Sequence, residues 1–487
     1  MLLRCALAVA CSMVLCSARA QQAPAGAGDA LSPAAALELA MRHEARFRSA
    51  EAAFRAESEG VALARSRLLP ELGLNVARTR NSLDSSFNGR GQPHLDYYSG
   101  GASVTVRQPL YRPESRARLR QADAENTRQA ALLDGERGRL AMDLAVAYLE
   151  VLRAQADVVA ERAQHEALLG LVAAARRAEP LGLGSAADRD ARQAKAELAN
   201  LRVLQAEAHR AEAVRRLERM VGQPVQRLLG PAEQDFVWLP GGPGPLAGWQ
   251  AQARERSPDV LAAQAAVRVA REGIERARAE ALPTLDLVAG RSKSTSDSYS
   301  SVNNTYFNTS LGLQLSVQLY AGGRHDAGIR QAVAQHERAQ ALLEGAQREL
   351  DEAVAHEYEL VAQADRRLKA HQVVVRNARQ ALEAARLGTA RGTLSTLDIA
   401  DAQAQLETAR AEQTTARLQM LAAQLKLHTL SGDAPWLSLA PLDRWLVEPV
   451  AVVRASSPPA GVLSGGLNLK PTPLMAAQPT RVQSAAR

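Results

Sequence analysis

The chain has 487 residues, and alanine makes up roughly a fifth of them. Aromatic residues account for 3%, charged residues of both signs for 23%, and the formal net charge is +7. So few aromatics argue against several ordinary globular domains and against a single-chain membrane β-barrel, which carries aromatic girdles. A mean hydropathy of -0.21 excludes a bundle of membrane-spanning helices, and without a concentrated basic block we expect no nucleic-acid partner. The composition indicates long, closely packed helices.

Residues 1–20 carry the pattern of a secretory signal peptide. Arg4 supplies the positive charge, residues 5–16 are apolar, and Ala18 and Ala20 are small residues where signal peptidase reads the chain. All three cysteines lie in this segment. In the mature chain we therefore expect no disulfide, no thiol nucleophile and no cysteine metal site.

Beyond the signal peptide the chain contains an internal duplication. The sequence LPELGL at residues 69–74 recurs as LPTLDL at residues 282–287, and the Leu-Tyr pair at 110–111 recurs at 319–320. Matches in one order at nearly one offset predict two copies of one structural unit. A third match has the same order: Gly184, Asp190, Ala194, Ala196 and Leu198 recur as Gly392, Asp398, Ala402, Ala404 and Leu406.

The predicted boundaries follow from the two copies. Residues 240–245 read PGGPGP, which is typical of a linker, and the C-terminal residues are rich in Pro, Ser and Ala, which is typical of disorder. We expect a signal peptide at 1–20, a first structural repeat at 21–222, a linker at 223–245, a second repeat at 246–432 and a partly disordered tail at 433–487.

Each repeat opens with a predicted helix, which is followed by two strands. Ser32 and Ser257, each before a proline, are the expected N-caps, and Pro70 and Pro283 end the two helices. Apolar and polar residues alternate over residues 311–320, which is long enough for a tilted strand that crosses a membrane. We expect polar loops between the strands at 81–98 and 291–304.

The second strand of each repeat leads into a very long helix. Residues 113–178 hold no proline after the first position and residues 326–387 hold none, so each helix can extend roughly 90–100 Å. Each ends in a glycine-containing turn, after which a shorter helix returns. These lengths predict antiparallel helical hairpins whose tips lie far from the strands.

Four strands per chain are too few to close a membrane barrel. An open sheet edge is not tolerated in lipid, so the chain must share its strands with copies of itself. A ring of copies also turns the helices into a hollow cylinder. We therefore expect a mainly α protein with a small β part, built as a conduit through a membrane.

Together these features resemble the TolC-type family of outer-membrane efflux and secretion proteins over nearly the whole mature chain. The resemblance rests on the repeated LPxLxL sequence, the RQPLY sequence at 107–111 and the GxxxxxDxxxAxAxL motif at both tips. It implies a homotrimer in the outer membrane of a Gram-negative cell. The three copies share a twelve-stranded β-barrel, and their long antiparallel helices form an α-barrel that extends into the periplasm. No cofactor is implied.

Within the family, the chain most resembles the branch that serves type I protein secretion. Leu15 precedes Cys16 where a lipoprotein signal requires a very small residue, which disfavours the multidrug lipoprotein branch. The resemblance implies a passive exit duct, embedded in outer-membrane lipid, for an unfolded secreted protein of the toxin or protease class. Its partners are an inner-membrane ABC transporter and a periplasmic membrane fusion or adaptor protein. The alternative is the outer-membrane channel of a multidrug or small-molecule efflux pump.

Two acidic residues after the second tip are the candidate gate. Asp398 and Asp401 lie three apart on one helix face, and the resemblance implies rings of acidic side chains at a periplasmic constriction here. The alternative is that they are first-turn acids favoured by the helix dipole, which suits Asp190 better. Ala385 stands where the family has a latch tyrosine, and Arg391 lies in a longer turn, so no latch is assigned.

The resemblance also implies that the adaptor binds at the glycine-rich tips, although glycines there also permit the helices to reverse. Catalysis has no support, because the histidines are scattered and the sequence holds no metal-binding spacing, phosphate-binding loop or nucleophile motif. We therefore expect no enzyme activity and no metal site. The expected docking residues are Gly182, Leu183, Gly184, Ser185, Gly388, Thr389 and Gly392.

Overall fold

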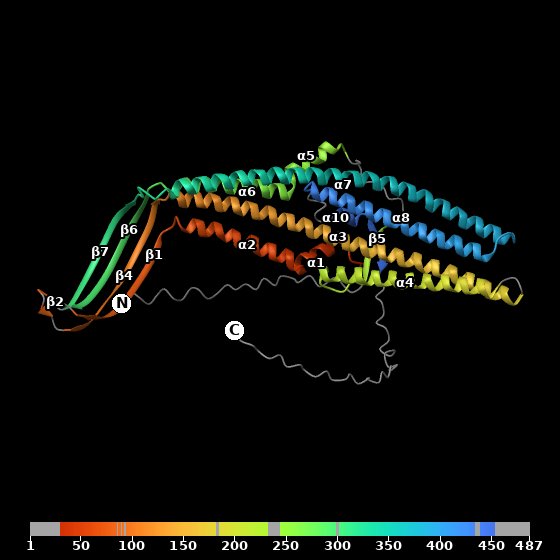
Figure 1. Ribbon diagram of the computed structural model, residues 1–487, viewed down its shortest axis with the longest axis horizontal. Coiled ribbons are helices and arrows are strands. Elements are labelled where there is room, and N and C mark those ends of the chain that lie inside the picture. Colours follow the sequence, from red (N-terminus) through yellow and green to blue (C-terminus); the bar gives the residue numbers. More distant parts are fainter. Residues whose placement is uncertain are drawn as a thin grey trace, which may run out of the picture. The chain divides into compact units, whose positions relative to one another are not determined.

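The first half of the chain folds in the predicted order of helix, two strands, long helix and returning helix (Figure 1). The structure, a computed structural model, describes residues 30–84, 86–88, 90–91, 94–181, 185–231, 244–298, 301–433 and 439–452. The expected signal peptide and the tail beyond residue 452 lie outside them. The main elements of this half are α1 (Pro33–His43), α2 (Ala45–Ser66), β1 (Glu71–Leu83), β4 (Leu95–Tyr111), α3 (Pro113–Ala178) and α4 (Ala186–Val221).

The second half repeats these elements with matching lengths. Both α1 and α5 have 11 residues, and both α2 and α6 have 22. The chain is thus a duplicated, mainly α protomer with a small β part, as predicted. The elements of this half are α5 (Leu246–Arg256), α6 (Pro258–Ala279), β6 (Thr284–Ser298), β7 (Ser301–Ser316), α7 (Arg324–Ala390) and α8 (Thr396–Leu430).

Ser257 is the N-cap position of a helix, as predicted, but that helix, α6, is not the first of the second repeat. Ser32 does cap α1, because its side chain accepts a hydrogen bond from the N–H of Ala35 at 3.2 Å. Ser257 instead lies at the break between α5 and α6, the position that Glu44 occupies between α1 and α2. A proline after serine marks the start of a helix, but it does not distinguish the first helix of a repeat from the second.

Four antiparallel strands form the main sheet in the order β1-β4-β6-β7. They have 13, 17, 15 and 16 residues, so they are longer than the sequence pattern indicated. β7 ends at Ser316, which pairs with Thr284, although the alternation continues to Tyr320. Pro283 precedes Thr284 and has no N–H to donate, so β6 offers no partner beyond that pair.

The predicted polar loops at 81–98 and 291–304 are largely wrong, because strands occupy most of both ranges. Pairing in the first hairpin continues to Leu83 and Leu95, and a small two-stranded ribbon follows, formed by β2 (Ser86–Phe87) and β3 (Arg90–Gly91). Serine, threonine and asparagine indicate exposure to water. Their backbone groups still require partners, and a neighbouring strand supplies them.

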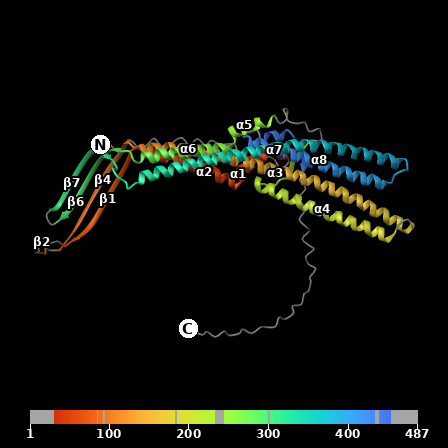
Figure 2. The ribbon, with the colours of Figure 1, turned by 45° about the horizontal axis from the view of Figure 1, so that its top comes forward.

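The long helices run beside one another and continue into the strands at one end (Figures 1 and 2). α3 has 66 residues and α7 has 67, which corresponds to a length of about 100 Å. α3 packs against α2, α4, α6 and α8, whereas α8 packs against α7 and α3. None of the described helices is both long and apolar enough to cross a membrane.

An ion pair joins the two halves where the sheet meets the helices. Arg112, the residue before α3, donates hydrogen bonds from Nε and Nη2 to the Asp286 carboxylate on β6 at 2.9 and 2.5 Å. Asp286 is 6% exposed, and a buried carboxylate is stable only when it is paired. The pair therefore fixes the start of the first long helix against a strand of the other half.

A small two-stranded sheet beside the middle of α3 joins the two ends of the described chain. β5 (Arg227–Pro231) pairs with β8 (Leu446–Ala451), and α10 (Ala440–Asp443) precedes β8. The Tyr148 hydroxyl accepts a hydrogen bond from the Leu229 N–H and donates one to the Leu31 carbonyl, both at 2.7 Å. Parts of the predicted linker and tail are thus ordered, because Leu228 and Leu446 enter the core, each 0% exposed.

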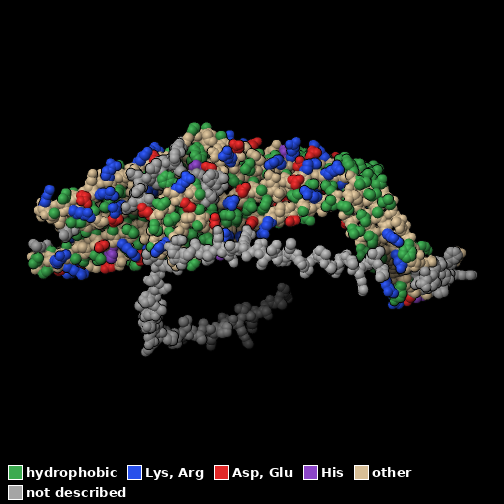
Figure 3. Space-filling view, turned by 180° about the vertical axis from the view of Figure 1, so that it is seen from behind, with side chains coloured by type: hydrophobic (Ala, Val, Ile, Leu, Met, Phe, Trp, Pro, Cys, Tyr) green, Lys and Arg blue, Asp and Glu red, His purple; other side chains and the backbone are tan. Residues whose placement is uncertain are grey.

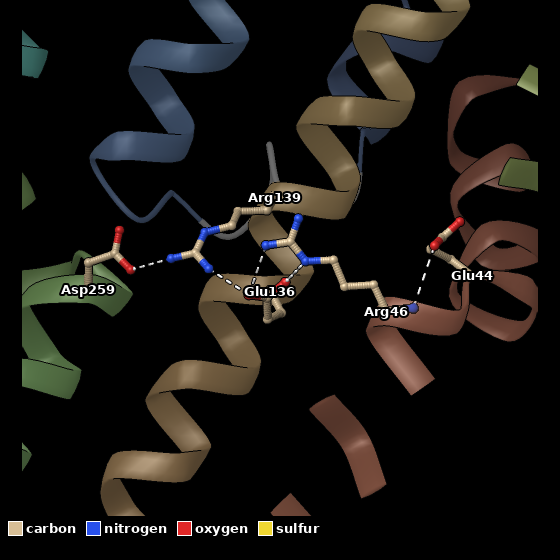
Figure 4. A network of polar contacts seen from close by, with 5 residues as sticks. All are labelled: Glu44, Arg46, Glu136, Arg139 and Asp259. Carbon is tan, nitrogen blue, oxygen red and sulfur yellow. Dashed lines mark hydrogen bonds and ion pairs between the residues drawn. The ribbon is translucent and has the colours of Figure 1, made fainter. Parts of the chain in front are cut away.

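Opposite charges distinguish the two halves where α2 and α6 begin (Figure 4). Arg46 and Asp259 are each the second residue of their helix. On α3, Glu136 pairs with Arg46 at 3.0 Å, and Arg139 pairs with Asp259 at 3.1 Å. Exposed ion pairs add only about 0–1 kcal/mol each. Their value here is that equivalent positions carry opposite signs, so the two short helices are not interchangeable against α3.

Candidate functional site: sheet faces and helix tips

The register of the main sheet separates its side chains into two faces, because opposed residues of antiparallel strands lie on the same side. Two rows that cross all four strands show the difference: Leu72, Val106, Ala289 and Leu311 on one face, and Asn75, Ser103, Ser292 and Asn308 on the other. Leu72 and Leu311 are 72% and 75% exposed, so no described part of the chain covers the apolar face at these two positions. A membrane-crossing sheet with a polar lumen requires this division.

The second helix tip is a tight turn built on backbone hydrogen bonds. The Gly388 carbonyl accepts from the N–H groups of Arg391 at 3.2 Å and Thr393 at 2.9 Å. Gly392 has a φ of 75°, a left-handed conformation that glycine adopts without a steric cost. The Thr389 hydroxyl lies within hydrogen-bond distance of the Ala385 and Ser395 carbonyls. The Thr389 side chain therefore stabilises the turn itself.

Asp398 is part of the cap that starts α8. Its Oδ2 accepts from the Ser395 N–H at 2.7 Å and from the Ser395 hydroxyl at 2.9 Å, while the Asp398 N–H donates to the Ser395 hydroxyl at 3.3 Å. This reciprocal arrangement is a capping box. Asp401 follows one turn later and is half-buried. Within the described residues its carboxylate has no hydrogen bond or ion pair, so Asp401 is the freer of the two acids.

The structure corrects the register of the tip motif by two residues. Ser185 caps α4 as Ser395 caps α8, and the Asp188 N–H donates to the Ser185 hydroxyl at 3.1 Å. The structural equivalent of Asp398 is thus Asp188 and not Asp190. The spacing of glycine and alanine concealed this, because the turn before each cap serine has its own length. Asp190 pairs with Arg189 at 2.9 Å and raises the pKa of that guanidinium.

At the first tip only Ser185 of the expected docking residues is described, since Gly182, Leu183 and Gly184 lie outside the described residues. Both tips expose large apolar side chains that the sequence analysis did not single out. Leu181 is 71% exposed, Leu387 58% and Leu394 43%. In the sequence, such residues can be recognised as leucines close to a glycine turn. They are exposed because the end of a helical hairpin has no core that could bury them.

The returning helices α8 and α4 differ in how many faces they bury. α8 buries Leu406 against α7 and Leu418 against α3, and Ala411 lies seven residues before Leu418 on the same face, 8% exposed. Because α4 and α8 begin after equivalent cap serines, Ala411 corresponds to Leu201. Leu201 is 54% exposed, since α4 packs against α3 but has no second long helix beside it.

A charged cavity of about 930 Å³ separates the α3/α4 hairpin from the α7/α8 hairpin. Two histidines reach it, and each pairs within its own hairpin: His209 with Glu150 at 3.3 Å and His371 with Glu412 at 3.7 Å. Burial raises the pKa of Asp157, another lining residue.

No group of three or more metal-ligating side chains occurs among the described residues. The polar clusters instead consist of ion pairs between neighbouring helices and hydrogen bonds of the tip turn. The space-filling view shows blue and red side chains interspersed along the helices, whereas green side chains cover the sheet next to them (Figure 3). The surfaces that stand out are therefore the two faces of the sheet and the helix tips.

This architecture is that of the TolC-like outer-membrane channels. The crystal structure of the Campylobacter jejuni CmeC outer membrane channel matches it with a TM-score of 0.67 at 13% sequence identity, over 85% of this chain and 89% of that one. The chain belongs to the outer membrane efflux protein family, whose family model matches residues 36–223 and 249–433. The resemblance to the TolC-type family and the outer-membrane location are thereby confirmed.

Two relatives resemble the chain over most of their length. The alkaline protease secretion protein AprF of Pseudomonas aeruginosa is 30% identical over 81% of this chain and 83% of its own. The proteases secretion protein PrtF of Dickeya chrysanthemi is 29% identical over 86% of this chain and 92% of its own.

Proposed function

We propose that this protein is the outer-membrane exit duct of a tripartite type I secretion system. It passively conducts an unfolded protein of the toxin or protease class to the outside, without catalysis, cofactor or metal. The similarity to AprF and PrtF carries this proposal, because both are named for protease secretion and both match over more than four fifths of this chain. The polar, small-residue face of the sheet is suited to line an aqueous path for such a chain.

We propose that three copies assemble around this path. β1 and β7 are the ends of the strand order, and an unpaired sheet edge in lipid costs several kcal/mol for each unsatisfied group. The exposed face of α4 supports the same assembly. The internal repeat indicates what covers it: α8 lies against both α7 and α3, so α7 of the next copy would take the equivalent place beside α4.

The helix tips are the proposed binding site for the periplasmic adaptor, which links the duct to an inner-membrane ABC transporter that supplies the energy. The proposal includes the turn residues named from the sequence, and it adds Leu181, Leu387 and Leu394. Exposed leucines on a rigid turn offer apolar contact area to a partner. These tips lie at the end of the long helices opposite the sheet (Figure 1).

We propose that Asp398 and Asp401 form the acidic gate, with Asp401 as the main ligand for cations. Three copies of an unpaired carboxylate around a narrow pore attract cations strongly. Asp398 contributes less, because its Oδ2 already accepts two hydrogen bonds in the helix cap.

Asp401→Ala is expected to weaken the block of the channel by multivalent cations by about tenfold, because one charged ring is lost. Asp398→Ala is expected to change the block less and to destabilise the tip by about 0.5–2 kcal/mol through loss of the cap. Single-channel recordings in planar bilayers measure the block. Asp188→Ala removes the acid at the equivalent position of the first hairpin, where the carboxylate pairs with Arg192 at 3.1 Å; it is the control and should leave the block unchanged. Unaltered block in Asp401→Ala would remove the gate assignment.

Efflux of small molecules is the second candidate function, since the family that contains the chain is named for efflux. The two functions differ in what fails when the gene is removed. A secretion duct leaves its protein substrate inside the cell, whereas an efflux channel leaves the cell sensitive to toxic small molecules.

Deletion of the gene is expected to lower the secreted toxin or protease in the culture supernatant at least tenfold, as measured by immunoblot against a cytoplasmic marker. The protein to follow is a secreted protein whose gene lies beside genes for an ABC transporter and an adaptor. Expression of the wild-type gene from a plasmid should restore secretion. Normal secretion together with increased drug sensitivity would contradict the proposal and favour the efflux channel.

A further inference from the structure

The apolar face of the main sheet becomes basic toward the end farthest from the helices. On β1, Arg78 and Arg80 follow Leu74 at even spacing, which keeps them on the same face. On β6, Arg291 and Lys293 follow Ala289 in the same way. We call these four residues the basic belt. On β1 the two arginines lie beyond the leucines and valine of that strand, whereas Arg291 and Lys293 of β6 pair with Val104 and Ala102, so the belt overlaps the outer rows of the apolar band. Blue side chains are visible toward this end in Figure 3.

Among the described side chains, one of the four cations of the basic belt pairs with an acidic group. Arg80 pairs with Asp96 at 3.1 Å. Another acid near this end, Asp84, accepts from His94 at 2.7 Å, and that hydrogen bond raises the pKa of His94. Among the described side chains, no carboxylate lies within ion-pair distance of the remaining three cations. The face thus carries exposed, unpaired positive charge directly beside apolar surface.

Aromatic rings hold two of the cations in place. The Arg78 guanidinium lies 5.1 Å from the centre of the Tyr98 ring, and the Lys293 Nζ lies 5.6 Å from the centre of the Phe307 ring. Such contacts orient a cation without neutralising it, and aromatic rings favour the interface between lipid and water.

Between the cations of β1 and β6, the surface of the sheet carries small side chains. The intervening strand β4 places small residues there, because Gly100 pairs with Arg78 and Ala102 pairs with Lys293. Arginine matches the geometry of phosphate oxygens with two parallel hydrogen bonds, and lysine adds a compact charge. The arrangement is therefore open to a phosphate group that approaches from the membrane side.

We propose that the basic belt binds the phosphate groups of anionic lipid headgroups at the outer edge of the membrane, while the acyl chains lie along the apolar band. This inference rests on the proposed role of the sheet as the membrane-crossing part of the duct. Cations, aromatic rings and leucines lie next to one another on this face. This favours a lipid as the ligand, because a soluble anion would contact only the charged groups. Binding anchors the sheet at a fixed depth, and its strength falls as salt screens the charges.

The test uses the full mature chain in dodecyl maltoside and lipid A, a diphosphorylated glucosamine lipid, with its dephosphorylated form as the second probe. Native mass spectrometry measures bound lipid. The triple variant Arg78→Ala, Arg291→Ala, Lys293→Ala is expected to bind lipid A at least about tenfold more weakly than the wild type. The charge-retaining variant Arg78→Lys, Arg291→Lys should bind more strongly than the triple variant but more weakly than the wild type, because lysine keeps the charge and loses the two parallel hydrogen bonds.

The matched control removes three exposed arginines from α2 by Arg48→Ala, Arg55→Ala and Arg65→Ala and should leave binding unchanged. Equal binding of the dephosphorylated lipid, or equal affinity of the wild type and the triple variant, would overturn the inference. Conductance in planar bilayers separates this result from the proposed function. If wild type and triple variant both conduct but bind lipid A equally, only the belt is refuted. If the wild type forms no channel, the duct proposal fails, and the binding assay still decides whether the belt recognises phosphate.

Discussion

Replacement of Leu201 by aspartate is expected to abolish self-assembly of the protein, whereas replacement of Leu198 leaves it intact. Both are exposed leucines of α4, at 54% and 57%. They differ in the internal repeat, because Leu201 corresponds to the buried Ala411 of α8, whereas Leu198 corresponds to the exposed Thr408. Only the first position therefore lies on the face that a neighbouring long helix covers.

The expected effect of Leu201→Asp is large because it is repeated at every contact of the ring. Burial of one leucine contributes about 1.5–3 kcal/mol, and a buried unpaired carboxylate adds a desolvation cost. At each interface the association constant should fall more than tenfold, at about 1.4 kcal/mol per factor of ten. Light scattering coupled to size-exclusion chromatography in detergent measures the mass. A trimer in both variants, or its loss in both, would contradict the assignment of this face, and circular dichroism checks that the helices remain.

Gly432→Ala is expected to lower the free energy of unfolding by about 2–4 kcal/mol. Gly432 follows α8 with a φ of 68°, and a Cβ there would lie 2.4 Å from the carbonyl oxygen of Arg256 at the end of α5. Both the left-handed backbone and the close approach to another backbone exclude a side chain. The change would separate α5 from α8 and loosen the adjoining core.

Two glycines provide controls for this effect in thermal unfolding followed by circular dichroism. Gly345 lies within α7 with nothing within 4 Å of an added Cβ, so Gly345→Ala should stabilise the helix by about 0.5–1 kcal/mol. Gly222 is the equivalent of Gly432 and has a φ of 79°, but the added Cβ would meet the His43 side chain, which can move. Gly222→Ala should therefore destabilise less than Gly432→Ala. Equal stability of all three variants would show that the αL turn is not required.

Local signals in the sequence were sufficient for the long helices. Prolines mark the ends of α2 and α6 and the start of α3, and α3 spans the predicted residues 113–178. The strands were recognised from alternation, but their outer parts were not. Ser, Thr and Asn are equally common in loops, and only the partner strand distinguishes the two cases.

The features that the sequence could not reveal depend on residues far apart in the chain. β5 and β8 pair across more than 200 positions, and each is too short to show a periodic pattern. The register of the tips required the cap hydrogen bonds of Ser185 and Ser395, since the glycine and alanine spacing favoured an alignment two residues away. The exposure of Leu201 is also invisible in sequence, where it is one more leucine on an amphipathic helix.

The small sheet of β5 and β8 beside the middle of α3 determines in which order the parts of the protomer can fold. Its core combines Leu31, which precedes the first described helix, with Leu446, close to the last described residue. β5 therefore has no partner strand until β8 is present, whereas the Tyr148 hydroxyl contacts Leu31 and Leu229, which both precede β8 in the chain. A chain that is still being delivered across the inner membrane can form its helical hairpins but cannot close this core. Maturation of the protomer is accordingly tied to completion of export, which delays stable folding until the C-terminal strand has arrived.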